Sequence, residues 1–405
     1  MLPKGFLCSA TNAGIKQTTR NDLALIVSEV SAACAGTFTK NIVKAAPVIV
    51  DINRLKNGPY WCKAILANSG NANACTGQQG IDDVLCCTEH LSKTLNFVPE
   101  DILMASTGVI GLRLPARKII QAIPTLTSKL SSSPDALTQV AEAILTTDTY
   151  PKIVTKQITL SNTTVTISAC CKGAGMIAPD MTDSQNLHAT MLCFLMTDAL
   201  VDPVWWQGIL NNAVECSFNR IIVDGDTSTN DTVLAMANGL AGNPLLSFSR
   251  KADAELMSDT VQEVLYKLAH MIVDDGEGAT KCVSIHVTGA QTEQDAMTVA
   301  RTIASSPLVK TALYGEDPNW GRIIAAAGRS GITFNPDEVS IQIAGIKIVE
   351  KGMPLGEHAE KSASEQMKLK QFSIVVNLGQ GRAQGKILTC DFSTDYIKIN
   401  ADYRT

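Results

Sequence analysis

Two kinds of pattern alternate along the chain, and their order restricts the fold more than any other feature of the sequence. Runs rich in Val, Ile and Thr are typical of strands and cover residues 61–67, 163–169, 220–223, 283–287, 339–349 and 372–377. Between them, apolar residues recur at helical spacing, most clearly over 261–272 and 296–303. Because helices and strands mix without a regular βαβ repeat, we predict an α+β fold, built as a layered α/β sandwich rather than a barrel.

Three shorter segments support local predictions. The stretch 339–350 alternates strictly around Gly345, which favours a hairpin or a bulged strand. Asp202 followed by Pro203 is typical of a helix N-cap with proline at the first helical position. The glycine-rich stretch 379–385, GQGRAQG, resembles a dinucleotide-binding loop, but no helical pattern follows it. We therefore expect a hairpin there.

The composition excludes several classes of protein. Of the 405 residues, 45% are apolar and 18% are charged, which allows a large core and argues against a disordered chain. The net charge is −5 and no Lys/Arg block stands out, so nucleic-acid and anionic-membrane partners are disfavoured. The apolar run 191–196 is far shorter than the roughly 20 residues of a membrane span. The N-terminal segment lacks the pattern of a signal peptide, and we expect a soluble, cytoplasmic protein.

The cysteines and histidines signal neither a disulfide framework nor a metal site. The twelve cysteines include the neighbours Cys86 and Cys87 and the neighbours Cys170 and Cys171, and no C-x-x-C occurs. We expect most of them to be reduced and buried as small apolar side chains. The five histidines are far apart and none forms H-x-x-x-H, so neither a zinc site nor a Ser-His-Asp triad is indicated.

Polar and small residues gather in nine segments, each of which is typical of a turn when taken alone. These segments are 68–77, 105–111, 146–152, 172–176, 188–192, 224–232, 274–281, 314–322 and 400–405.

One of these segments permits a specific chemistry. Thr190 stands directly before the apolar run 191–196, which we predict to be a buried strand, and the simplest interpretation is that Thr190 begins it. The alternative is that the Ala189–Thr190 bond breaks. Thr190 would then carry both a nucleophilic hydroxyl and an α-amine base with a pKa of about 7.7–8.0. Such a site needs no histidine.

Read together and in order, these segments resemble the bifunctional ornithine acetyltransferase (glutamate N-acetyltransferase) family of arginine biosynthesis. The motifs that carry the resemblance run from SATNAGIK through ANSGNANACTG, STGVIG, TTDTYPK, KGAGMIAP, ATML, DGDTSTNDT, DDGEGATK and YGEDPNWGRI to INADYRT. It implies a precursor that cuts itself before the threonine of ATML. The products would be an α chain of residues 1–189 and a β chain of residues 190–405, assembled as an α2β2 heterotetramer.

The resemblance also assigns catalytic roles. Thr190 corresponds to the threonine that becomes the nucleophile and carries the acetyl group. Thr107 and Gly108 correspond to the pair that forms the oxyanion hole. A hydroxyl and a backbone N–H can stabilise a tetrahedral oxyanion, and glycine lets the backbone approach closely.

Further residues correspond to the family's substrate contacts: Lys172, Glu277, Asn400, Thr405 and one threonine of the TTD segment, with Thr147 favoured and Thr146 left open. An ammonium suits the carboxylates of an amino-acid substrate, and a carboxylate suits the amine of ornithine. Asn400 and Thr405 follow a β-type run at 396–399, at a chain end that would ordinarily fray.

One departure from the family pattern precedes the expected cleavage site. Residues 182–188 are additional to the usual spacing between KGAGM and ATML. We expect cleavage at Ala189–Thr190, and Met181–Thr182 is an alternative that lacks the following MLCFLM strand. Because the insertion precedes the scissile bond, it is compatible with an intact Thr190 after cleavage.

The implied reaction moves an acetyl group from N-acetylornithine to glutamate by a ping-pong mechanism. It needs no cofactor, although some family members also use acetyl-CoA as donor. Two alternatives remain open at this point: an aminopeptidase or amidase of the related N-terminal-nucleophile superfamily, and a non-catalytic homologue whose insertion blocks maturation.

Overall fold

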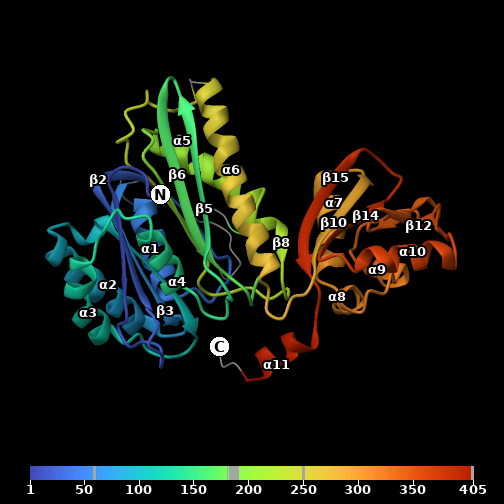
Figure 1. Cartoon of the computed structure of the whole chain (residues 1–405), viewed down its shortest axis with the longest axis horizontal. Coiled ribbons are helices and arrows are strands. Elements are labelled where there is room, and N and C mark those ends of the chain that lie inside the picture. The colour runs from blue at the N-terminus through green and yellow to red at the C-terminus, as the bar shows by residue number, and fades with distance from the viewer. Residues whose placement is uncertain (58–60, 180, 182–190, 249–250, 403–405) are drawn as a thin grey trace. The chain divides into compact units, whose positions relative to one another are not determined.

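The computed structural model describes residues 1–57, 61–179, 181, 191–248 and 251–402 (Figure 1). They divide into two units. The first is built from Met1–Asn219 and Asp226–Ala269, and the second from Arg220–Gly225 and the chain after Ala269. The expected boundary between the α and β chains falls within the span of the first unit.

The first unit contains an eight-stranded sheet in the order β4-β3-β2-β9-β7-β6-β5, with β1 paired to β2. Its strands are β1 (Phe6–Thr11), β2 (Leu23–Phe38), β3 (Trp61–Asn71), β4 (Ile102–Val109), β5 (Lys152–Leu160), β6 (Thr163–Lys172), β7 (Leu192–Thr197) and β9 (Thr232–Ala237). The strands predicted at 61–67, 163–169 and 191–196 are thus confirmed.

Strand β2 divides this sheet into two layers. Its first half pairs with β1 and β3, and its second half pairs with β9. Between Val27 and Ala32 the register against β3 shifts, and residues 29–31 are exposed. Extra residues of this kind bend a strand. Both ends of β2 therefore reach the edge opposite the bend, where Leu23 pairs beside the end of β3 and Phe38 beside the start of β9.

The core lies between the two layers because alternate side chains of each strand point to opposite faces. Residues of both layers that share this core include Ala24, Ile26, Cys34, Phe38, Ile65, Leu103, Phe194, Met196, Leu234 and Met236. The other face of the first layer, with Leu25 and Leu66, packs against helices α2 (Gly77–Leu95) and α3 (Ala116–Ser128).

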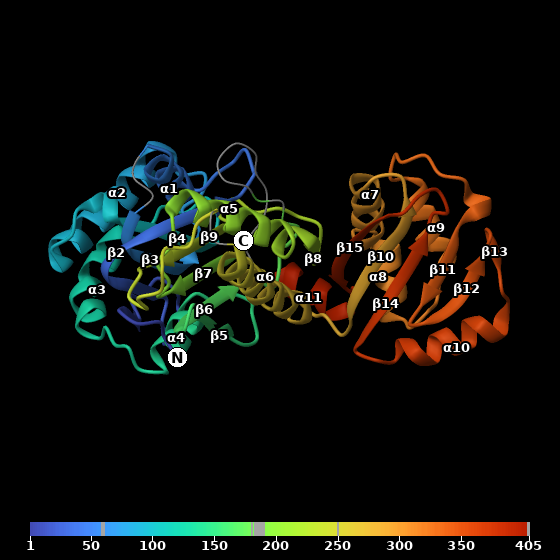
Figure 2. The same ribbon diagram turned by 90° about the horizontal axis from the view of Figure 1, so that it is seen from above.

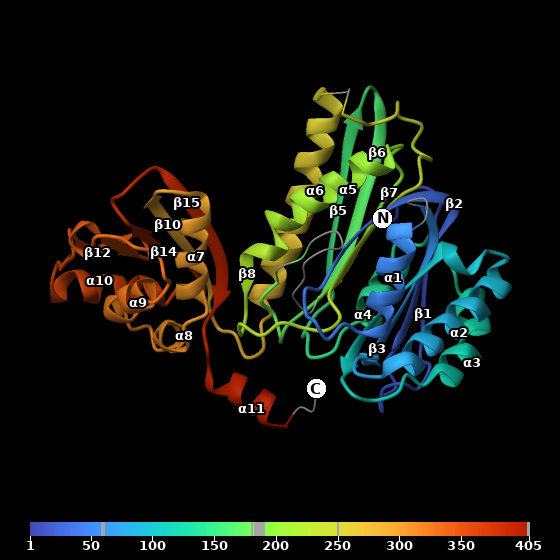
Figure 3. The same ribbon diagram turned by 180° about the vertical axis from the view of Figure 1, so that it is seen from behind.

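Helices α5 (Pro203–Glu215) and α6 (Lys251–Asp274) cover the outer face of the second layer (Figure 3). The Trp206 indole N–H of α5 donates to the carbonyl of Ala235 at 3.2 Å. On α6, the carbonyl of Leu268 accepts from the Cys171 thiol of β6 at 3.9 Å. The unit is a helix–sheet–sheet–helix sandwich, so the predicted layered fold is confirmed.

The remaining helices of this part of the chain are α1 (Ala46–Asn57), α4 (Ala136–Ala143) and the short η1 (Pro99–Asp101) and η2 (Phe218–Arg220). The predicted cap of α5 is confirmed, because the Asp202 carboxylate accepts the backbone N–H of Trp205 at 2.9 Å. Among the described residues, no helix combines the length and apolar character of a membrane span. All twelve cysteines are free, and nine of them are buried, as expected.

The second unit has a seven-stranded sheet in the order β13-β12-β11-β14-β10-β15-β8, most of which can be followed in Figure 2. Its strands are β8 (Ile221–Ile222), β10 (Cys282–Ala290), β11 (Ser340–Ile343), β12 (Ile346–Glu350), β13 (Met353–Pro354), β14 (Gln371–Asn377) and β15 (Ala383–Cys390). Its helices are α7 (Glu293–Ala304), α8 (Pro307–Tyr314), α9 (Trp320–Gly328), η3 (Pro336–Glu338), α10 (Glu357–Met367) and α11 (Thr394–Asp402).

Two glycine-containing turns in this sheet have different outcomes. The hairpin predicted around Gly345 is confirmed as β11 and β12. The hairpin predicted at 379–385 is wrong, because β14 and β15 pair with opposite edges of β10 and not with each other. The loop instead crosses the end of β10, where the backbone N–H groups of Gln380 and Gly381 donate to the carbonyl of Gly289.

The β-type run predicted at 396–399 is also wrong, since these residues lie in α11. The Ser393 hydroxyl accepts the backbone N–H groups of Asp395 and Tyr396, at 3.1 and 3.4 Å. This contact caps the first turn and favours a helix over the β-propensity of the side chains.

Asn230 ties the two layers together at the edge opposite the bend in β2. It is buried two residues before the start of β9, and its amide nitrogen donates to the carbonyls of Ala72 and Ser106 in the first layer, at 2.6 and 2.8 Å. One side chain thus holds the starts and ends of strands from both layers at a fixed separation.

We predict that Asn230→Ala lowers the free energy of unfolding by about 2–4 kcal/mol, because two buried carbonyls lose their donor. Urea denaturation followed by circular dichroism measures the change. The control is Asn53→Ala on the exposed side of α1, which should leave the midpoint nearly unchanged. Equal midpoints for the two variants would show that Asn230 does not clamp the layers.

Candidate functional site

Five strand ends meet at the edge of the sandwich opposite the bend in β2. In the first layer β3 and β4 are parallel and end together, and Ser69 pairs with Thr107 two residues before the end of each strand. In the second layer the end of β6 at Lys172 pairs with the start of β7 at Leu192, which in turn pairs with the start of β9 at Thr232. The motifs 68–77, 105–111, 172–176 and 224–232 therefore converge.

The side chains of Thr107 and Lys172 meet across the two layers. Leu103 and Ala105 of β4 face the core, and Thr107 continues that face at 2% exposure. On β6, Cys170 faces the core and Lys172 continues its face. The Lys172 ammonium donates to the Thr107 hydroxyl at 3.5 Å. Two residues predicted to act together are thus in contact.

Gly108 follows Thr107 in a conformation that requires glycine. Its φ is +132°, and a Cβ at this position would lie 2.4 Å from the carbonyl carbon of Gly70 and 2.5 Å from the nitrogen of Asn71. The end of β4 therefore rests directly on the backbone of β3. The role of the Gly108 N–H in an oxyanion hole stays a prediction.

Lys172 belongs to a buried group of charged side chains that also includes Asp148 and Lys152. The Asp148 carboxylate accepts from the Lys152 ammonium at 2.8 Å and lies 3.9 Å from the Lys172 ammonium. It also accepts the backbone N–H groups of Gly173 at 2.7 Å and Thr146 at 3.1 Å. Asp148 thus joins the TTD segment to Lys172.

The electrostatics of this group favour an anionic ligand. Burial opposes ionisation of Asp148, but the charges of Lys172 and Lys152 outweigh it and lower the Asp148 pKa to about 2. Asp148 is therefore ionised at neutral pH, beside the ammonium groups of two lysines. A lysine ammonium at this edge is suited to a carboxylate of a substrate.

Sequence reasoning missed Asp148 and Lys152, although both stand in TTDTYPK. The available signal was an acid and a lysine four positions apart in a segment already marked as unusual. Thr146 and Thr147 are both half-buried beside this group, so the choice between them as the substrate-binding threonine stays open.

In the second unit, the structure brings Glu277 and Asn400 together. The Asn400 amide nitrogen donates to the Glu277 carboxylate at 2.8 Å, and Glu277 is 8% exposed. Gly278 has a φ of +68°, and a Cβ there would lie 2.4 Å from the backbone nitrogen of Tyr396. The Ser393 hydroxyl also donates to the Gly278 carbonyl at 2.6 Å. The loop 276–278 therefore packs against the first turns of α11 and bonds to them.

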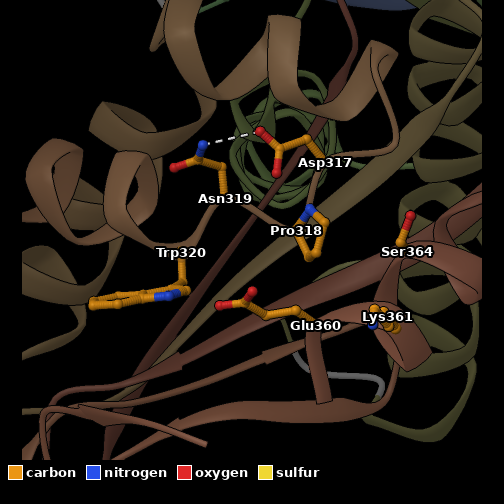
Figure 4. Close-up of a pocket in the computed structure, with 7 residues that line it drawn as sticks. All are labelled: Asp317, Pro318, Asn319, Trp320, Glu360, Lys361 and Ser364. Carbon is orange, nitrogen blue, oxygen red and sulfur yellow. Dashed lines mark hydrogen bonds between the residues drawn. The ribbon is translucent and has the colours of Figure 1, made fainter. Parts of the chain in front are cut away.

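The motifs 274–281 and 314–322 also meet in the second unit. The Lys281 ammonium bonds the Glu316 carboxylate at 2.7 Å. Beyond Glu316 lies a cavity of about 340 Å³ lined by Asp317, Pro318, Asn319, Trp320, Glu360, Lys361 and Ser364 (Figure 4). The Asn319 amide donates to Asp317 at 2.9 Å on its wall. None of the predicted site residues lines this cavity.

Four predictions fall outside the described residues. They concern the Ala189–Thr190 cleavage site with Thr190 as nucleophile, the insertion 182–188, the alternative site at Thr182 and the contact of Thr405.

Met181 and Met191 are the described residues nearest to the insertion on its two sides, and hydrogen bonds hold both of them. The Asn219 side chain exchanges two hydrogen bonds with the backbone of Met181, at 2.7 and 2.9 Å. The carbonyl of Met191 accepts the backbone N–H of Thr232 at 2.9 Å. Met191 leads into β7 at the point where Leu192 pairs with Lys172.

Known proteins resemble this chain in sequence over almost its whole length. The ArgJ family profile matches residues 7–405. The chain is 46% identical to the arginine biosynthesis bifunctional protein ArgJ of Geobacter sulfurreducens and 46% identical to that of Desulfotalea psychrophila, with 99% of each chain covered in both cases. The crystal structure of the Bacillus halodurans protein argJ shares 43% identity, with a TM-score of 0.49, over 51% of this chain and 96% of that one.

We predict that Asp148→Asn lowers the free energy of unfolding by about 3–5 kcal/mol at pH 7, because it leaves Lys152 buried without its counter-charge. The folded-state pKa of Asp148 lies below its ordinary 3.8, so its contribution is present above about pH 4 and is lost as the pH falls through 2. Urea denaturation at pH 7 and at pH 3 should show the difference between wild type and variant shrinking.

The matched control is Glu89→Gln, which removes an exposed carboxylate from its pair with Lys93. This change should have no measurable effect at either pH. A loss for Asp148→Asn that is the same at both pH values would show that charge pairing is not its cause.

Proposed function

The chain belongs to the ArgJ family and is an ornithine acetyltransferase (glutamate N-acetyltransferase) of arginine biosynthesis, and we propose that Thr190 is its nucleophile. The observation that carries the proposal is the buried contact between Lys172 and Thr107, beside Gly108. The strand that follows Thr190 begins next to this contact, since Leu192 pairs with Lys172.

In the first half of the reaction, the Thr190 hydroxyl attacks the acetyl carbonyl of N-acetylornithine, and the Thr190 α-amine accepts the hydroxyl proton. The Thr107 hydroxyl and the Gly108 N–H donate to the developing oxyanion. Collapse breaks the amide C–N bond, and the proton moves from the α-ammonium to the departing nitrogen. Ornithine leaves and an acetyl ester remains on Thr190.

In the second half, the amine of glutamate attacks the ester carbonyl in the same oxyanion hole. The bond between the carbonyl carbon and the Thr190 oxygen breaks, and the amine proton returns to that oxygen through the α-amine. The products are N-acetylglutamate and free enzyme. No step requires a cofactor, and whether acetyl-CoA also serves as a donor for the first half stays open.

The substrate contacts follow from charge. Lys172 binds a carboxylate that both amino acids share, and Asp148 keeps its ammonium ionised and oriented. Glu277, held by Asn400, binds an ammonium group of the substrate. One threonine of the TTD segment and Thr405 complete the proposed set.

The proposal includes maturation. Cleavage at Ala189–Thr190 frees the α-amine that the mechanism uses as base. We propose that the two chains remain together as an α2β2 heterotetramer that acts in the cytoplasm on small-molecule substrates.

Wild-type protein should therefore appear as fragments of 189 and 216 residues, and Thr190→Ala as one intact chain, because the attacking hydroxyl is gone. Intact mass spectrometry and N-terminal sequencing give the masses and the cut point. Thr182→Ala is the control and should be cut normally. Cleavage of Thr190→Ala at the same bond would exclude Thr190 as the self-cleaving nucleophile. A single inactive wild-type chain would support a maturation-impaired homologue.

Thr107→Ala should lower kcat for transfer from N-acetylornithine to glutamate by roughly 10² and leave KM nearly unchanged, since its hydroxyl acts on charge that develops in the transition state. Steady-state kinetics on fully cleaved protein measure both constants. Thr107→Ser retains the hydroxyl and should recover most of the rate. If KM rises as much as kcat falls, Thr107 has a structural role instead.

A further inference from the structure

Lys16 belongs to the opening motif SATNAGIK, which the proposed mechanism does not use. The Asp22 carboxylate organises its loop by accepting the backbone N–H groups of Ala13, Ile15 and Lys16, at 2.6, 2.6 and 2.9 Å. The Lys16 ammonium donates to the carbonyl of Leu145 at 2.6 Å, directly before the TTD segment. The loop therefore places a half-buried lysine ammonium beside the TTD segment.

The aliphatic part of the Lys16 side chain packs against Gly70, which in turn packs against Gly108 of the proposed oxyanion hole. A Cβ on Gly70 would lie 2.8 Å from the Lys16 Cγ, and a Cβ on Gly108 would lie 2.4 Å from the Gly70 carbonyl carbon. Lys16, Gly70 and Gly108 are thus in direct van der Waals contact, one on the next. The ammonium of Lys16 reaches beyond this contact towards the carbonyl of Leu145.

Four charged groups face Lys16. Burial lowers the Lys16 pKa to about 8. Among the facing charges, Asp22 of its own loop and Asp148 raise this pKa, whereas Lys172 and Arg20 lower it. With a pKa of about 8, the Lys16 ammonium changes its charge near physiological pH. A bound carboxylate would favour the protonated form.

The two amino acids of the proposed reaction are alike at one end and opposite at the other. Both carry an α-carboxylate, but the side chain of ornithine ends in an ammonium and that of glutamate in a carboxylate. Lys172 is held by the ionised Asp148 and suits the shared carboxylate. A cation that can give up its proton suits the end that differs, because it need not repel the ammonium of ornithine.

We infer that Lys16 is a substrate-binding residue that recognises the side-chain carboxylate of glutamate in the second half-reaction. This inference rests on the proposed function. The contact would be a charge-assisted hydrogen bond, and the same site would accept N-acetylornithine without it.

The test is steady-state kinetics of Lys16→Met with both substrates. The KM for glutamate should rise roughly 10- to 100-fold, as expected for the loss of one charge-assisted hydrogen bond. The KM for N-acetylornithine should change less than about threefold, and self-cleavage should be complete. The control is Lys118→Met, which removes an exposed lysine that donates to Gly14 of the same loop and should alter neither KM.

A second variant keeps the inference testable if Lys16→Met folds poorly. Lys16→Arg retains the charge at all accessible pH values. From pH 7 to pH 9 the glutamate KM of wild type should rise relative to that of Lys16→Arg, as Lys16 loses its proton. The ratio removes the titration of the glutamate amine, which is common to both proteins.

Equal rises in both KM values, or no rise in either, would overturn the role of Lys16 while leaving the acetyltransferase intact. A parallel pH dependence in wild type and Lys16→Arg would overturn it as well. Absence of acetyl transfer in the wild type would instead overturn the proposed function on which the inference depends.

Discussion

The bend in β2 is the constraint on which the rest of the first unit depends. A straight strand of this length would place the end of β3 and the start of β9 far apart, at its opposite ends. Because the strand turns between Val27 and Ala32, the same hydrogen-bonded sheet folds back on itself and closes a core between its halves. The polar strand ends then face each other, and Asn230 bridges them.

Within that edge, burial makes the charges dependent on one another. Lys152 and Lys172 are withdrawn from water, and the ionised carboxylate of Asp148 lies beside both of their ammonium groups. The carboxylate is itself fixed by two backbone N–H groups. These charges are therefore held in place before any ligand arrives, which limits the reorganisation that binding and catalysis would otherwise require.

Much of the fold and part of the site could be predicted from the sequence. The β-type run 61–67 and the apolar run 191–196 predicted β3 and β7, and the motifs pointed to Thr107 and Lys172, which are in contact. The errors arose where a tertiary contact overrides local preference: the Ser393 cap makes 396–399 helical, and Gly381 crosses β10 instead of turning a hairpin. Asp148 was missed because its role depends on Lys172, which is distant in sequence.

The contact between Gly70 and Gly108 also has a consequence for how this protein can change over time. A side chain on Gly108 would need the space that the backbone of Gly70 occupies, and a side chain on Gly70 would need the space that Lys16 and Ile15 occupy. Neither position can therefore accept a larger residue while the strands and the opening loop keep their places. The SATNAGIK, NSGN and STG motifs constrain one another in this way, although they are separate in the sequence, and a change in one of them requires a matching change in its neighbour.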